Sequence, residues 1–208
     1  AYGLPVLEKL RSVEARGPKA LILSPTRELC LQIADDLEGF SKHMPSLRIL
    51  AVYGGANIEP QIRALKAGVD IIVATPGRLL DLMKRGVAQL SNISHVVLDE
   101  ADEMLSMGFQ EDLDAILEGV PQERSTLLFS ATMSKEIERI AKNYLHSPHT
   151  IQVGSRNEGA ESVNHIYYMV HAKDKYLALK RIVDFYPRIY AIIFCRTRME
   201  TQEVADNL

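Results

Sequence analysis

The sequence contains only two cysteines, and it lacks any apolar run of the length, about 18 residues, that crosses a bilayer. Residues 1–17 lack a basic stretch followed by a long apolar stretch, so they do not resemble a secretory signal. Cys30 and Cys195 lie far apart in apolar runs, which favours a reduced intracellular protein over a disulfide or a metal site. A net charge of −3 argues against a bulk electrostatic grip on nucleic acid, but not against a local basic stripe. We therefore expect a cytoplasmic protein with no membrane span.

What the chain does have is the composition of an ordinary globular protein, with 208 residues, 47% of them hydrophobic and 25% charged. Short aliphatic runs, typical of strands buried on both faces, alternate with segments of helical periodicity. The predicted strands are residues 20–25, 48–55, 70–76, 95–100, 125–132 and 149–153. The predicted helices are residues 26–40, 60–68, 76–86, 109–120 and 134–145. This alternation predicts an α/β fold, a parallel sheet flanked by helices with right-handed crossovers.

Polar, turn-rich strings occur where five of these predicted strands stop, and they read SPTRE, GG, ATPGR, DEAD and SAT. In an open α/β sheet the ligand crevice lies at the carboxyl ends of the strands. We therefore expect these strings to gather along one edge of the sheet. Taken singly, Ser24, Thr75, Ser130 and Thr132 are also acceptable helix N-caps.

The stretch VVLDEADEML, residues 96–105, places three carboxylic acids directly after a buried strand. One interpretation is an ordinary helix start, because acidic side chains favour the positive end of the helix dipole. The other is a site for a metal-bound nucleotide, where one carboxylate holds the magnesium shell and its neighbour polarises a water. The stretch alone does not decide between them.

A polar, glycine-containing segment, GSRNEGAES at residues 154–162, interrupts the pattern and predicts a linker. Beyond it we expect strands at 165–170 and 190–195 and helices at 175–186 and 198–208. Two strands and two helices are too few to cover a stable sheet. Residues 163–208 are therefore interpreted as the beginning of a second α/β domain, with residues 1–153 as most of the first.

Six strings together resemble the DEAD-box RNA helicases of superfamily 2. In this sequence they are PTREL from Pro25, Gly54-Gly55, TPGR from Thr75, DEAD from Asp99, SAT from Ser130, and IIFC from Ile192 followed by Thr197-Arg198. They occur in the order and at the spacings typical of that family. The resemblance implies two RecA-like domains joined by a linker, with ATP and RNA bound across the cleft.

The resemblance also implies a role for each acidic or hydroxyl group in the DEAD and SAT strings. Asp99 is expected to hold Mg²⁺ through its water shell, and Glu100 to orient and deprotonate the attacking water. Asp102, Ser130 and Thr132 are expected to form hydrogen bonds between adjacent strand ends, which would couple nucleotide state to RNA strand separation. Phosphoryl transfer needs mainly positioning and charge neutralisation, which agrees with these roles.

RNA contacts are implied for a further set: Thr26, Arg27, Gly55, Thr75, Gly77, Arg78, Thr197 and Arg198. None of these groups is suited to reading a base edge, so binding should follow the sugar-phosphate backbone and be largely independent of sequence. Structural alternatives exist for three of them. Arg27 could form an ion pair with Glu28 or another carboxylate, Gly54-Gly55 could be only a tight turn, and Arg198 could begin a solvated helix face.

A phosphate-binding loop of the form GxxxxGK[ST] is missing, because no Gly-Lys pair occurs in these 208 residues. The opening AYGLPVLEKL resembles the helix that follows this loop in the family. The glutamine motif that reads adenine and the later arginine motif are missing as well. We interpret the chain as part of an ATP-dependent helicase and expect it to be inactive alone. The alternative is a non-catalytic RecA-like module that binds RNA or protein, and a DNA helicase is less favoured.

Overall fold

The structure is a computed structural model that describes residues 1–11, 17–153 and 163–208. The chain divides into two compact units, Ala1–Glu158 and Gly159–Leu208. The predicted linker at 154–162 lies outside the described residues. Within the described ranges, no helix combines the length and the apolar character that a bilayer crossing requires.

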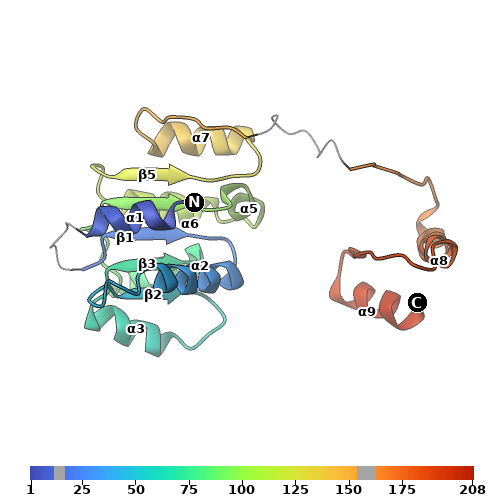
Figure 1. Cartoon of the computed structure of the whole chain (residues 1–208), viewed down its shortest axis with the longest axis horizontal. Helices are drawn as coiled ribbons and strands as arrows, with labels where there is room; N and C mark the ends of the chain where they lie inside the picture. The colour runs from blue at the N-terminus through green and yellow to red at the C-terminus, as the bar shows by residue number, and fades with distance from the viewer. Residues whose placement is uncertain (12–16, 154–162) are drawn as a thin grey trace. The chain divides into compact units, whose positions relative to one another are not determined.

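A five-stranded parallel sheet forms the centre of the first unit (Figure 1). Its strands are β1 (Ala20–Leu23), β2 (Ile49–Val52), β3 (Ile71–Ala74), β4 (His95–Leu98) and β5 (Ser125–Leu128), in the order β2-β3-β1-β4-β5. Every neighbouring pair runs parallel. The predicted parallel sheet is therefore confirmed, with each strand shorter than its predicted run.

Helices cover both faces of this sheet. They are α1 (Gly3–Leu10), α2 (Arg27–Phe40), α3 (Ile58–Ala67), α4 (Pro76–Lys84), α5 (Ala101–Ser106), α6 (Gln110–Glu118) and α7 (Lys135–Tyr144). Successive strand residues point to opposite faces. Ala20 and Ile22 pack with α1 and α2, whereas Leu21 and Leu23 pack with α4 to α7 and the partly buried side of α3. Both faces of β1 and β3 are fully buried, which explains their continuous apolar runs.

A buried ion pair fixes the end of the sheet where the strands begin. Lys19 Nζ lies 3.1 Å from Asp70 Oδ1, with side chains only 10% and 11% exposed. The other oxygen of Asp70 accepts a hydrogen bond from the Arg48 backbone N–H at 2.9 Å. Burial raises the pKa of Asp70, but the hydrogen bonds from Arg48 and Lys19 outweigh it, so this pKa lies below its ordinary value.

Replacing Asp70 with Asn should lower the free energy of unfolding at pH 7 by about 3 kcal/mol, because Lys19 would remain buried without a counter-charge. A depressed pKa stabilises the fold fully above the unfolded-state value of about 4, and this contribution is lost as the pH falls through the lower folded-state value. The difference between the two proteins should therefore shrink at acidic pH. Urea unfolding at pH 7 and at about pH 3 measures it. As control, Asp81→Asn breaks an exposed pair with Arg85 and should cost less than about 0.5 kcal/mol. An equal loss in both variants would contradict the prediction.

The second unit contains a short 3₁₀ turn (Ala172–Asp174), α8 (Lys175–Phe185) and α9 (Arg198–Asn207). Both helices agree with prediction.

Three strand predictions, at 149–153 in the first unit and at 165–170 and 190–195 in the second, are wrong, since these residues are in neither strand nor helix. A strand is held by hydrogen bonds to a neighbour. Within the described residues no strand lies beside these segments, and Tyr190 and Phe194 are 104% and 91% exposed.

Candidate functional site

The sequence strings predicted to meet do lie along one edge of the sheet. In the parallel register Leu23 is paired with Ala74 and Leu98, and Leu98 is paired with Leu128. Backbone bonds continue past the strand ends, with Asp99 N–H donating to Leu23 and Thr75 N–H to Val52. The loops that follow all five strands therefore start next to one another.

Asp99 directly follows β4 and accepts two hydrogen bonds. The Tyr2 hydroxyl donates to Oδ2 at 2.6 Å, and the backbone N–H of Glu100 donates to Oδ1 at 3.1 Å. The Tyr2 ring packs on Phe129 with a centroid distance of 5.2 Å. Burial, together with the hydrogen bond to Asp99, raises the pKa of Tyr2 far above its ordinary value. Tyr2 therefore remains a donor, and it fixes the orientation of the carboxylate.

Glu100 lies at the turn between β4 and α5 in a left-handed conformation, with φ of 50° and ψ of 51°. Few residues other than glycine adopt this region, and non-glycine residues there are often found at functional sites. The Glu100 side chain is exposed and does not cap the helix it precedes. Side-chain capping of the helix therefore does not account for this residue.

Asp102, in the first turn of α5, is hydrogen-bonded to the loop after β5. Its Oδ2 accepts from the Thr132 hydroxyl at 2.8 Å and from the Thr132 backbone N–H at 2.9 Å. The Ser130 hydroxyl donates to the Thr132 carbonyl at 2.7 Å. Burial raises the pKa of Asp102, but hydrogen bonding by the Thr132 and Ser130 hydroxyls lowers it by more. The pKa of Asp102 therefore lies below its ordinary value. The capping alternative for Ser130 and Thr132 is wrong, because Ser134 caps α7.

Thr26, Arg27 and Gly55 are the predicted RNA contacts that follow β1 and β2. Thr26 caps α2 by accepting the Leu29 N–H at 3.2 Å. The guanidinium of Arg27 lies over the Tyr53 ring, 5.0 Å from its centroid. Among the described residues it makes no ion pair, so that alternative is wrong. Gly55 has a φ of 75°, which requires glycine for the turn but leaves its surface open.

The predicted contacts after β3 lie at the start of α4. Thr75 is buried at the N-cap position but makes no capping bond with its side chain, and Pro76 opens the helix. Gly77 is exposed in the first turn. Arg78 donates from Nη2 to the Ala56 carbonyl at 3.0 Å, whereas its Nη1 is buried without a partner in the described part of the chain.

The remaining predicted RNA contacts belong to the second unit. Thr197 caps α9 by accepting the Glu200 N–H at 3.1 Å. Arg198 is the first residue of α9 and is exposed. These observations favour a helix start for Thr197 and agree with a solvated position for Arg198.

Sequence reasoning missed Tyr2 and Tyr53. Tyr2 precedes a helix, and no spacing rule links it to a residue 97 positions away. Tyr53 directly follows β2, so its place at the strand end was available as a signal, but its contact with Arg27 depends on the side-chain directions.

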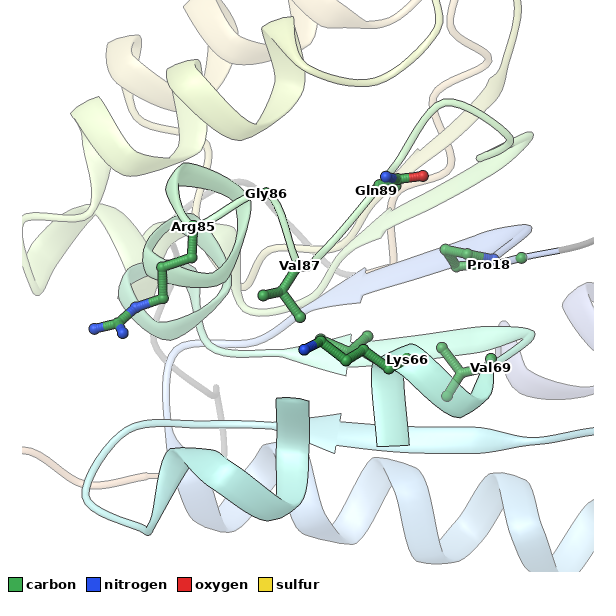
Figure 2. A pocket seen from close by; sticks show the side chains of 10 residues that line it. Pro18, Lys66, Val69, Arg85, Gly86, Val87 and Gln89 are labelled. Carbon is green, nitrogen blue, oxygen red and sulfur yellow. The ribbon is translucent and has the colours of Figure 1, made fainter. Parts of the chain in front are cut away.

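Two cavities lie at opposite ends of the strands. One of about 210 Å³ is lined by Tyr2, Asp36 and Asp99 among others, and it lies beside the carboxylates described above. Figure 2 shows a larger one, of about 450 Å³, lined by Pro18, Lys66, Val69 and Val87. Pro18 and Val69 precede β1 and β3, so this larger cavity lies at the opposite end of the strands, and no predicted site residue lines it.

The end of the sheet that carries Asp99 and Glu100 suits a hydrated Mg²⁺ ion. Among residues 1–11, 17–153 and 163–208, no three His, Cys, Asp or Glu side chains form a cluster able to hold a metal. Mg²⁺ in nucleotide sites is commonly held by one or two carboxylates, with waters and phosphate oxygens as the other ligands. Asp99, with Glu100 beside it, fits that donor set.

The cysteines take no part in this site. Both are free, and burial raises the pKa of Cys30 to about 11, so its thiol is unreactive.

The five-stranded parallel sheet, with two adjacent carboxylates and a carboxylate-hydroxyl bond beyond the carboxyl ends of neighbouring strands, is an open α/β domain that carries its polar groups where such folds bind ligands. Residues 1–140 match the family described as DEAD/DEAH box helicase. The chain belongs to this family.

Its relatives are named as helicases. The chain is 43% identical over its whole length to a DEAD-box ATP-dependent RNA helicase CshA of Geobacillus kaustophilus and to the ATP-dependent RNA helicase DeaD of Escherichia coli. It spans 44% and 33% of those proteins. A crystal structure of a DEAD box protein from Methanococcus jannaschii matches 99% of the chain with a TM-score of 0.66 and 38% identity, and the match covers 54% of that protein.

Proposed function

We propose that this chain is part of an ATP-dependent RNA helicase that couples ATP hydrolysis to RNA duplex unwinding or to remodelling of RNA-protein complexes. The observation that carries the proposal is the edge formed by Asp99, Glu100 and the Asp102-Thr132 hydrogen bond. The names of relatives matched over the whole chain support it. In this proposal residues 1–153 are the first RecA-like domain, 154–162 the linker and 163–208 the start of the second.

The hydrolytic step is assigned to the two carboxylates at the end of β4. Asp99, oriented by the Tyr2 hydroxyl, would hold Mg²⁺ through water, and the bound ion would supply charge neutralisation for the phosphates of ATP. Glu100, exposed and free of a capping role, orients a water and accepts its proton as the water attacks the γ-phosphate. Asp102 and Thr132 transmit the state of this site between neighbouring strand ends.

RNA binding is assigned to the loops beside this edge. Arg27, the open surface of Gly55, and the first turn of α4 with Thr75, Gly77 and Arg78 offer cations, closely approachable backbone and free amides. These groups suit phosphate oxygens, so we assign sequence-independent contacts to the RNA backbone. Thr197 and Arg198 are proposed to add contacts from the second domain.

The proposal is tested by comparing the full-length protein with the 208-residue chain. The full-length protein should hydrolyse ATP in response to RNA and unwind a short RNA duplex. The 208-residue chain, which has no Gly-Lys pair to cradle phosphate, should do neither and should not bind ATP with micromolar affinity. Isothermal titration with MgATP measures the ATP affinity, and a phosphate-release assay measures hydrolysis.

The second candidate function, a non-catalytic RNA-binding or protein-binding module, makes the opposite forecast for the full-length protein. Its RNA binding would persist without RNA-stimulated hydrolysis. Micromolar ATP affinity of the 208-residue chain would instead overturn our view that the phosphate-binding part is missing from it.

A further inference from the structure

Strand β2 has an open backbone edge. It is the last strand of the sheet, and among the described residues β3 is the only strand that pairs with it (Figure 1). The carbonyls of Arg48 and Val52 accept hydrogen bonds from β3 and its flanking residues. Because alternate residues of a parallel strand direct their backbone groups to the same side, those of Ile49 and Ala51 face away from β3. Such an edge is a template for another strand unless it is covered.

A groove follows this open edge. It has a volume of about 450 Å³ and lies between α2 and α3, with β2 as its floor. Its apolar lining includes Leu31 and Ala34 of α2, Pro60 of α3, and the half-buried residues Ile49, Leu50 and Ala51. The flanking helices therefore leave space along the strand instead of closing over it.

The groove is also lined by polar and acidic side chains, among them Gln61, Asp35 and Glu38. Gln61 is 7% exposed and donates from Nε2 to the Tyr53 carbonyl at 3.2 Å. Gln61 lines the groove, and its Oε1 is buried without a hydrogen-bond partner in the described part of the chain. Asp35 and Glu38 on α2 are exposed at the groove and form no ion pair among the described residues.

We propose that this groove binds an extended, basic peptide segment of a partner protein, which adds a strand beside β2. The outward N–H and C=O groups of Ile49 and Ala51 would pair with the peptide backbone, and its alternate side chains would pack on the half-buried floor. Asp35 and Glu38 would attract its lysines or arginines. This proposal is independent of the helicase function.

The charges of the groove disfavour two other occupants. RNA would bring phosphates against Asp35 and Glu38, neither of which is neutralised by an ion pair among the described residues. A second copy of the chain paired through β2 would bring the same two carboxylates of each copy toward each other, and like charges at an interface oppose association.

The test uses the 208-residue chain and a fluorescein-labelled eight-residue peptide of alternating lysine and valine, followed by fluorescence anisotropy. Saturable binding is expected. Reversing both charges, Asp35→Lys with Glu38→Lys, should weaken it about tenfold or more. The matched control is Asp36→Lys, an exposed acid on the same helix that does not line the groove and should change affinity less than about twofold.

The strand-addition geometry has its own test. Ala51→Pro removes one outward N–H without touching the β3 ladder, a position where an edge strand tolerates proline, and it should also weaken binding about fivefold or more. Hydrogen exchange should show new protection of the Ile49 and Ala51 amides on binding, with Leu50 and Val52 unchanged. Thermal unfolding checks that both variants fold.

Several outcomes would overturn the proposal. They are the absence of saturable binding, equal affinity of the double variant and the Asp36→Lys control, and binding without protection of the Ile49 and Ala51 amides. Displacement of the peptide by an eight-uridine RNA that itself protects these amides would assign the groove to RNA. A concentration-dependent dimer that protects them without peptide would assign it to a second copy.

Discussion

The Glu100→Gln variant of the full-length protein should lose RNA-stimulated ATP hydrolysis by about a hundred- to ten-thousand-fold and still bind nucleotide. Gln has nearly the same size as Glu and keeps a hydrogen-bonding oxygen, but it cannot accept the proton of an attacking water. Glu100 is exposed and forms no capping bond, so the change removes no contact on which the fold depends. Phosphate release measures turnover, and a fluorescent ATP analogue measures binding.

The matched control for this variant is Glu103→Gln. Glu103 is also an exposed acid in the first turn of α5, and its loss should leave turnover within about twofold. The comparison separates proton transfer from the general effect of negative charge at this helix start. Turnover by Glu100→Gln at the unaltered rate would refute its role as the base.

Most of the first unit could be predicted because its signals are local. The central strands β1 and β3 are buried on both faces, so they appear in the sequence as continuous aliphatic runs, and the helices between the strands show a 3.6-residue period. The edge that carries Asp99 and Thr132 followed from strand direction alone. The lengths of the strands did not, because a residue such as Thr75 lies within a predicted strand run but already forms the N-cap position of α4.

Predictions failed where a segment depends on a partner elsewhere in the chain. The residues of 165–170 and 190–195 have the composition of strands, yet strand formation needs a neighbouring ladder, and none of the described residues supplies one. The same limit applies in the site. The Tyr2-Asp99 hydrogen bond and the Arg27-Tyr53 stacking contact join residues whose proximity arises only after helices pack on the sheet.

The Thr132→Val variant of the full-length protein should lose RNA unwinding about tenfold or more, while RNA-stimulated hydrolysis stays within about threefold of the parent. Valine preserves the shape of threonine but lacks the hydroxyl that donates to Asp102 at 2.8 Å. The backbone N–H of Thr132 still reaches the same oxygen at 2.9 Å, so the loop should remain attached. A net contribution of about 1.5–3 kcal/mol for a hydrogen bond to a charged group is consistent with an effect of tenfold or more.

The control for this prediction separates a coupling role from a structural one. Ser134→Ala removes the N-cap of α7, two residues from Thr132, and should lower stability by about 1 kcal/mol without changing the ratio of strands separated to ATP hydrolysed. Because the lowered pKa of Asp102 keeps this carboxylate ionised at neutral pH, the ratio for the parent protein should stay constant from about pH 6 to pH 8. Equal losses of unwinding and hydrolysis in Thr132→Val would show that the hydroxyl serves the hydrolytic site itself. A falling ratio with intact hydrolysis would instead place the coupling between α5 and the loop after β5 in this one bond.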